Sequence, residues 1–227
     1  MPVPDWIDDT RKSYDTVAVS YADLLRDALA GEPFQRGILG ILAEMVRAQG
    51  GGPVADIGCG PGRLTGYLDG IGLDVFGVDL SPAMIEVARR DHPGLRFEVG
   101  SMTALDVGDG SLAGVLAWFS LIHVPDDEVP TALSEFHRVL RPGGALLIGF
   151  HAGEGSRLKT EGYGGHPMNV YVHRRSPGRM VPWLEAAGFT VEAEMLHHPG
   201  PGVEGGFLFA GKPHQAVTAR VTGGVHR

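Results

Sequence analysis

The first fifty residues carry apolar side chains at the spacing of amphipathic helices. Between positions 5 and 48 these side chains recur every three or four residues, a period that favours helix over strand. Gly31-Glu32-Pro33 interrupts the pattern, and Gly50-Gly51-Gly52-Pro53 ends it. We therefore expect two helices at the start of the chain. The apolar positions that define them are Val17, Tyr21, Leu24, Leu25, Leu29, Ile38, Ile41, Leu42 and Met45.

From residue 53 the pattern changes to short apolar runs that alternate with helical stretches. Strands that alternate with helices favour right-handed crossovers, and hence a parallel, doubly wound α/β sheet. The predicted strands are Val54–Ile57, Leu73–Val78, Leu95–Val99, Gly114–Phe119 and Ala145–Phe150. The predicted helices are Leu64–Leu68, Pro82–Arg90 and Glu128–Leu140.

The C-terminal third begins with a glycine-rich stretch over residues 151–175 that has no clear period. It is too long for an ordinary connection, so we expect either a lid over a functional site or disorder. A helix from Ser176 to Gly188 and two strands, Phe189–Leu196 and Phe207–Gly211, complete the pattern. The predicted organisation is a helical cap over 1–50, a core over 51–212 and a flexible tail over 213–227.

Composition excludes several classes of protein. Acidic residues outnumber basic ones by 27 to 19 in the 227-residue chain, which argues against nucleic-acid binding by bulk charge. The single cysteine, Cys59, excludes an intramolecular disulfide and a thiolate zinc cage. The ten histidines form no compact ligand motif, so no metal site is expected. The apolar run from Ser111 to Pro125 is too short to span a bilayer, and we expect a cytoplasmic protein.

A glycine loop follows the first predicted strand, at Asp56-Ile-Gly58-Cys-Gly60-Pro-Gly62. Glycine is needed where a backbone turns sharply or lies against a ligand, and ligands of such sheets bind at the carboxyl ends of the strands. A dinucleotide fingerprint would require a glycine at position 63, which is Arg63 here. No Lys-Ser/Thr pair follows the loop, which excludes a P-loop.

Two carboxylates accompany the loop. Asp79 ends the second predicted strand, about 20 residues beyond the glycines, at the offset of a ribose-binding acid. Because a carboxylate accepts both ribose hydroxyls and repels a 2′-phosphate, an adenosine-type ligand without that phosphate is expected. Asp56, at the end of the first strand, suits a ligand with an ammonium group better than a pyrophosphate.

These residues resemble the class I S-adenosylmethionine-dependent methyltransferases, in particular the small-molecule enzymes of the ubiquinone-biosynthesis-like group. The resemblance implies a Rossmann-like, mostly parallel seven-stranded sheet whose last strand is antiparallel, and S-adenosylmethionine as cofactor. The segments that carry it are Tyr14-Asp-x-x-Ala-x-x-Tyr21, Val54–Gly62, Gly77–Met84, Arg138–Gly144 and Ala186–Phe189.

The resemblance also implies roles for individual residues. The glycine loop would pass beside the methionyl part of the cofactor, Asp56 would hold its amino group and Asp79 its ribose. One departure is Gly100-Ser101-Met102, where the family often has Gly-Asp, so the contact with the adenine amino group is weaker. The predicted cofactor-binding set is Tyr14, Tyr21, Asp56, Gly58, Gly60, Gly62, Asp79, Leu80, Met84, Ser101, Met102 and Phe119.

Candidate catalytic bases lie where strands end. His123 follows the fourth predicted strand and His151 follows the fifth, and histidine is the side chain best suited to accept a proton near neutral pH. The predicted acceptor-binding residues are Tyr163, Met168, Tyr171 and His173, all within residues 151–175. Two roles remain open for the neighbouring Arg174 and Arg175: contact with an acidic substrate or, as the commoner arrangement, a solvated pair.

The predicted function is methyl transfer by in-line displacement to oxygen or nitrogen of a small molecule. A protein or peptide terminus remains open as the acceptor. Two other classes also remain open: a cofactor-binding protein without catalysis, and a nicotinamide-dependent oxidoreductase, which Arg63 opposes. The sequence specifies neither the acceptor nor the oligomeric state.

Overall fold

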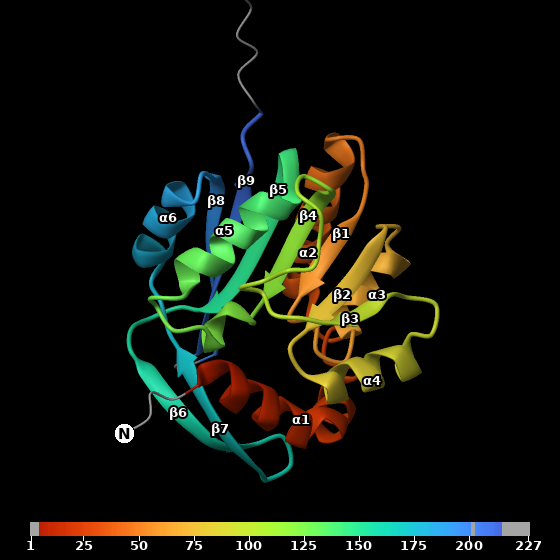
Figure 1. Cartoon of the computed structure of the whole chain (residues 1–227), viewed down its shortest axis with the longest axis vertical. Helices are drawn as coiled ribbons and strands as arrows, with labels where there is room; N and C mark the ends of the chain where they lie inside the picture. The colour runs from red at the N-terminus through yellow and green to blue at the C-terminus, as the bar shows by residue number, and fades with distance from the viewer. Residues whose placement is uncertain (1–4, 201–202, 215–227) are drawn as a thin grey trace, which may run out of the picture.

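A twisted seven-stranded sheet forms the centre of the molecule in the computed structural model, which describes residues 5–200 and 203–214 (Figure 1). The strand order is β3-β2-β1-β4-β5-β9-β8. Strands β1 to β5 pair in parallel, whereas β9 runs antiparallel to both β5 and β8. The predicted sheet with an antiparallel last strand is therefore confirmed. The strands are β1 (Val54–Ile57), β2 (Val75–Asp79), β3 (Phe97–Val99), β4 (Leu112–Trp118), β5 (Leu140–His151), β8 (Thr190–Gly200) and β9 (Val203–Gly211).

Helices cover both faces of this sheet. Successive side chains of β5 point to opposite faces, so Leu146 and Ile148 pack with α5 and α6, while Leu147 packs with α2 and α3. Full burial of one such side chain contributes about 1.5–3 kcal/mol to folding. The helices are α1 (Trp6–Leu25), α2 (Pro33–Ala48), α3 (Arg63–Gly70), α4 (Pro82–Asp91), α5 (Val129–Val139) and α6 (Pro177–Ala186), with a short 3₁₀ helix, η1 (Leu121–His123).

The glycine-rich segment after β5 forms an antiparallel hairpin of β6 (Ser156–Gly162) and β7 (His166–His173). The alternative of disorder was therefore wrong. Only one face of the hairpin is apolar: Met168 and Val170 are buried in a cluster with α1 and α4, while Asn169 and Tyr171 are exposed. In Figure 1 the hairpin and α1 lie together beyond the carboxyl ends of the parallel strands.

Helix α1 is fixed from two sides by side chains of its own. The Asp15 carboxylate accepts hydrogen bonds from the Ser81 hydroxyl at 2.6 Å and from the Ala83 backbone N–H at 3.1 Å, at the start of α4. On the other side, the Ser13 hydroxyl accepts a hydrogen bond from the Asn169 backbone N–H of β7 at 2.8 Å. Because α4 begins next to Asp79, these contacts hold α1 across the sheet end where the glycine loop lies.

Arg175 joins the base of the hairpin to η1. Its side chain is buried and donates to the Asp126 carboxylate at 2.9 Å and to the Leu121 carbonyl at 3.0 Å. The prediction of a solvated pair was thus wrong for this residue, since a buried cation needs partners of this kind. The contact fixes the turn that carries His123.

The position of α2 and the extent of the described residues bear on the predicted cap and tail. Helix α2 packs against the sheet through Leu39 and Leu42 and so belongs to a layer of the core. The division into cap, core and tail stays a prediction, and residues 215–227 of the tail lie outside the described residues. In the described part of the chain, no helix combines the length and apolar character that crossing a membrane requires.

Candidate active site

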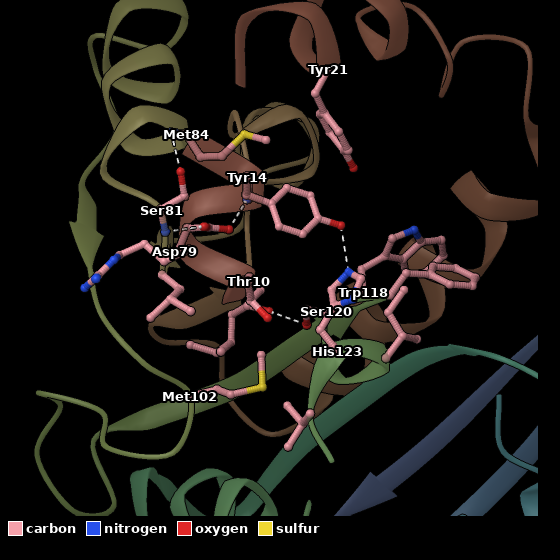
Figure 2. Close-up of a pocket in the computed structure, with 18 of the residues that line it drawn as sticks. Thr10, Tyr14, Tyr21, Asp79, Ser81, Met84, Met102, Trp118, Ser120 and His123 are labelled. Atoms are coloured by element: carbon pink, nitrogen blue, oxygen red, sulfur yellow. Dashed lines mark hydrogen bonds between the residues drawn. The ribbon is translucent and has the colours of Figure 1, made fainter. Parts of the chain in front are cut away.

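A cavity of about 370 Å³ lies beyond the carboxyl ends of β1, β2, β4 and β5, beneath α1. Figure 2 shows lining residues that come from α1, from the end of β2 and the start of α4, and from the turn after β4. The cavity brings most of the predicted site residues together. Those that line it are Tyr14, Tyr21, Gly58, Gly60, Asp79, Leu80, Met84, Ser101, Met102, Phe119, His123, His151 and Tyr163.

The glycine loop is shaped by a close approach to the turn after β4. Gly58 has a φ of +77°, and a Cβ there would lie 2.2 Å from the Ser120 Cβ, so no larger residue fits. Ser120 in turn donates its hydroxyl to the Ile57 carbonyl at 2.7 Å. The two turns therefore pack without space between them and form one wall of the cavity.

Asp79 connects the glycine loop to the turn after β2. One carboxylate oxygen accepts the Gly60 N–H at 2.8 Å, and the other accepts the Ser81 N–H at 2.9 Å. Burial raises the pKa of Asp79 to about 6, although these two N–H groups act in the opposite direction. Each carboxylate oxygen keeps a further lone pair for a hydroxyl donor within the cavity.

Asp56 is not brought to the cavity. It is buried at the end of β1 and accepts the Thr65 hydroxyl from α3 at 2.7 Å. Burial raises the pKa of this carboxyl group to about 7. The sequence placed Asp56 correctly at a strand end, but it did not reveal that Thr65 lies within hydrogen-bonding distance.

Arg63 lines the cavity instead, immediately after the glycine loop. Its Nη1 atom is shielded from solvent and has no hydrogen-bond partner among the described residues. A buried cationic donor without a partner is costly, and an anionic group of a ligand would remove that cost. Sequence reasoning used Arg63 only to exclude a dinucleotide site. The sequence feature that could have indicated a ligand contact is the position of this cationic residue, at the start of the helix that follows the glycine loop.

His123 makes two hydrogen bonds that occupy both ring nitrogens. Its Nδ1 lies 2.8 Å from the Tyr171 carbonyl of β7, and its Nε2 lies 2.7 Å from the Tyr14 hydroxyl of α1 (Figure 2). Burial lowers the pKa of His123 to about 4, so the ring is neutral near pH 7. A carbonyl can only accept, which places the ring proton on Nδ1 and makes Nε2 the acceptor of the Tyr14 proton.

His151 differs from His123 in its surroundings. It lines the cavity at the end of β5. Burial, followed by the charges of Arg174 and Lys159, lowers its pKa, and no hydrogen bond joins its ring to another described side chain. It is therefore a neutral imidazole with an acceptor nitrogen that a ligand can reach.

One aromatic ring, Phe119, lies beside His151, and Trp118 packs against Phe119. Phe119 lies 5.0 Å from the His151 ring and 5.7 Å from the Trp118 ring, measured between centroids. Its φ of 51° is left-handed, a conformation that costs a non-glycine residue on the order of 1–3 kcal/mol and is common at functional sites. Trp118 also lines the cavity and was not among the predicted site residues.

Four predicted residues other than Asp56 do not line the cavity: Gly62, Met168, Tyr171 and His173. Gly62 caps α3, where its φ of +80° and the nearby Phe97 ring explain the glycine. The pleat of β7 turns Met168 inward to pack with α1 and turns the Tyr171 ring outward, where it stacks on His173 at 6.1 Å. Tyr171 contributes its carbonyl to the site rather than its ring.

The side chains do not indicate a metal centre. Within residues 5–200 and 203–214, no group of three or more His, Cys, Asp or Glu side chains is placed to hold a metal ion.

Sequence comparison identifies related proteins. A family model described as a methyltransferase domain matches residues 54–144, from β1 into β5. A demethylmenaquinone methyltransferase from Renibacterium salmoninarum is 33% identical over 141 residues, which cover 62% of this chain and 58% of that protein. The matched segment thus spans less than two thirds of that relative.

Structural comparison covers more of the chain. A 1,6-didemethyltoxoflavin-N1-methyltransferase from Burkholderia thailandensis, solved with its substrate and S-adenosylhomocysteine, is 26% identical and has a TM-score of 0.71, covering 94% of this chain and 92% of that one. A magnesium protoporphyrin IX methyltransferase from Synechocystis, solved with bound S-adenosylmethionine, shares the fold at 18% identity and a TM-score of 0.69, covering 93% of this chain and 99% of that one.

These similarities agree with three features of the structure: the sheet order, the glycine loop after β1 and the acidic residue that ends β2. S-adenosylmethionine is the cofactor that they support. Residues 54–144 match the methyltransferase-domain family, and the described chain has the fold of solved S-adenosylmethionine-dependent methyltransferases.

Proposed function

We propose that this protein transfers the methyl group of S-adenosylmethionine to an oxygen or nitrogen atom of a small-molecule acceptor. One observation carries the proposal: a single cavity joins the Asp79 carboxylate to a neutral histidine, His151, whose ring has no hydrogen bond to the described residues. A protein that only bound the cofactor would have no need of the second group. The Phe119 ring beside His151 and the acidic net charge favour a small molecule over a nucleic acid.

The cofactor half of the cavity is proposed to lie between the glycine loop and the turn after β2. Asp79 would accept the ribose hydroxyls, while Leu80 and Met84 would pack near the adenine with Ser101 and Met102 on its other side. The buried, unpaired Nη1 of Arg63 would receive the carboxylate of the methionyl tail. Asp56, which the resemblance assigned to the amino group of the same tail, accepts the Thr65 hydroxyl and does not line the cavity.

The chemistry required of the protein is limited. The sulfonium of the bound cofactor supplies an activated methyl group, so the chain has to align the acceptor and to remove its proton. Well-oriented reactants can gain about 7–11 kcal/mol relative to free collision. A positioned general base contributes about 10²–10⁴-fold when the acceptor holds a proton.

His151 is proposed as that base. Its ring is neutral near pH 7, and the Phe119 ring beside it limits its position. The acceptor would lie between His151 and Tyr163. The proton on its nucleophilic oxygen or nitrogen would move to a ring nitrogen of His151, while a lone pair of that oxygen or nitrogen attacks the methyl carbon. His123 is not a base in this proposal, because Nε2 already accepts the Tyr14 proton.

The methyl-transfer proposal predicts a labelled small molecule. The protein would be incubated with S-adenosylmethionine carrying an isotopic methyl group and with separate small-molecule, peptide and RNA fractions. Mass spectrometry should find the label in the small-molecule fraction. Label found in RNA or protein, or cofactor binding without any transfer, would contradict the proposal, and the second outcome would favour a binding protein.

Replacement of the base should affect turnover rather than cofactor affinity. His151→Gln should lower kcat by about 10²–10⁴-fold and leave the dissociation constant of S-adenosylhomocysteine unchanged. His198→Gln, an exposed position on β8, serves as the matched control. In the wild type the rate should rise with pH through a pKa below the ordinary 6.5, since burial lowers it. An unchanged kcat in His151→Gln would remove this residue as the base.

Cofactor affinity should depend on the ionisation of Asp79. The ionised carboxylate accepts hydroxyl protons better, so S-adenosylhomocysteine binding should weaken as pH falls through about 6. Asp79→Asn should bind about 10–100-fold more weakly and lose this pH step, because hydrogen bonds to a charged group are worth about 1.5–3 kcal/mol. Calorimetry measures the affinity for S-adenosylhomocysteine and its dependence on pH, and circular dichroism checks that the variant is folded. A step retained in Asp79→Asn would assign the titration to another group, such as Asp56.

The tail contact can be separated from the adenosine contacts. Arg63→Gln should weaken S-adenosylhomocysteine by about tenfold, while 5′-methylthioadenosine, which lacks the amino-acid tail, should bind as before. Equal losses for both ligands would mean that Arg63 shapes the loop rather than holding the carboxylate.

A further inference from the structure

The β6–β7 hairpin carries cationic side chains on the face that packs against the rest of the molecule. In its register Lys159 pairs with Val170, and Arg157 pairs with Val172. Residues directly opposite each other in an antiparallel pair project from the same face, so each cation shares the face of its valine. Val170 is buried in a cluster with α1, which makes this the inner face of the hairpin (Figure 1).

Lys159 reaches the edge of the cavity from this face. Its side chain is half-buried, and its Nζ atom lies 3.8 Å from the centroid of the Tyr163 ring, which lines the cavity. An ammonium group has three N–H donors, and the ring face satisfies its charge only in part. Among the described residues, no carboxylate pairs with Lys159 and no oxygen accepts a hydrogen bond from it. The group therefore keeps donors for a ligand.

Arg174 lies at the base of the hairpin, beside His151. Its Nε atom donates to the Ala152 carbonyl at 2.9 Å, and its two Nη groups have no hydrogen-bond partner among the described residues. The next residue, Arg175, is different, because it pairs with Asp126 at 2.9 Å. The nearby carboxylate is thus used by Arg175, and Arg174 keeps the fork of donors that suits a carboxylate or a phosphate.

Both free cations act on His151. Burial lowers the pKa of this histidine, and the charges of Arg174 and Lys159 lower it further. The neighbouring His123 is neutral near pH 7 and adds no charge. The His151 end of the cavity is therefore positive, although the whole chain has a net charge of −8. A local field of this sign favours an anionic ligand.

We propose that the acceptor carries an anionic group, a carboxylate or a phosphate, which Lys159 and Arg174 bind at the His151 end of the cavity. The inference rests on the proposed function and names the class of its substrate. The anionic group is separate from the nucleophilic oxygen or nitrogen, which gives its proton to His151. Lys159 and Arg174 determine specificity, because the group that they bind does not react.

Binding of such an acceptor also changes the base. An anion held by the two cations offsets their charge, so the pKa of His151 rises when the acceptor binds. A base with a higher pKa accepts a proton more readily. A neutral acceptor of the same shape would leave both cations uncompensated. The two side chains thus favour an anionic acceptor in binding and in proton transfer.

The first test asks which small molecules accept the methyl group. A small-molecule extract is separated on an anion exchanger at neutral pH, and each fraction is incubated with the intact protein and isotopically labelled S-adenosylmethionine. The label should appear only with the retained fraction, in a product that is itself retained. Phosphatase treatment of that fraction should abolish transfer if the group is a phosphate monoester and leave it unchanged if the group is a carboxylate. Label from the unretained fraction, or in a product that is no longer retained, would overturn the proposal.

Replacement of either cation should weaken the acceptor and not the cofactor. Lys159→Met keeps the alkyl chain against Tyr163 and removes the charge. It should raise the amount of the retained fraction needed for half-maximal rate by about tenfold, with the affinity for S-adenosylhomocysteine unchanged. Arg174→Met should act in the same direction. Lys12→Met, an exposed position on α1 that pairs with Asp8, is the matched control. No change in either variant would contradict the proposed contacts.

A second test requires no turnover. The pKa of the His151 ring is followed by NMR in the complex with S-adenosylhomocysteine, with malonate as the anionic probe and malonamide as the neutral probe at equal ionic strength. Malonate should raise the pKa of His151, and malonamide should leave it unchanged. In the double variant Lys159→Met, Arg174→Met, malonate should have no effect. Equal effects of the two probes, or an effect retained in the double variant, would show that these cations form no anion subsite.

The outcomes separate this inference from the function on which it rests. If the label comes from the unretained fraction, methyl transfer stands and the anionic acceptor is wrong. If no fraction accepts the label, the methyl-transfer proposal fails, and the malonate titration still decides whether the cavity binds an anion. Circular dichroism checks that the variants are folded. If Arg174→Met unfolds, Lys159→Met alone decides, since it removes only a half-buried charge.

Discussion

The carboxylate of Asp79 ties together the two turns on which the cavity depends. It accepts one N–H from the glycine loop and one from the turn that starts α4. At the start of α4, Asp15 of α1 in turn accepts the Ala83 N–H and the Ser81 hydroxyl. Burial raises its pKa to about 6, because the charged form loses hydration that the backbone donors replace only in part. A ligand that offers two further hydroxyl donors completes the set. The fold thus buries the Asp79 carboxylate at a cost in desolvation free energy, which the hydroxyl groups of a bound ribose would offset.

The two histidines at strand ends show how surroundings decide function. Both follow parallel strands and both are neutral near pH 7. The nitrogens of His123 are taken by Tyr14 and Tyr171, so it serves structure and orientation. The ring of His151 makes no such bonds among the described residues and faces an aromatic wall. His123 lies in η1 after β4 and is buried, whereas His151 is the last residue of β5 and is only partly buried. Burial and hydrogen-bond partners together therefore separate the two residues.

The sequence predicted the parts of the fold that rest on local pattern. The first strand was predicted at Val54–Ile57 as observed, and the glycines and Asp79 followed from turn chemistry at strand ends. The hairpin was not predicted, because β6 is mostly exposed and only one face of β7 is apolar, which leaves little period to detect. Contacts between distant residues were also missed. Tyr14 lies 109 positions from His123, and no local signal reports that they meet.

The central claim is that this cavity selects an adenosyl thioether with its amino-acid tail. Calorimetric titration of the unaltered protein with S-adenosylhomocysteine and, separately, with NAD tests it most directly. The account predicts one saturable site for S-adenosylhomocysteine, with an affinity well above that for NAD. Tighter binding of NAD, or no binding of S-adenosylhomocysteine to the folded protein, would contradict it.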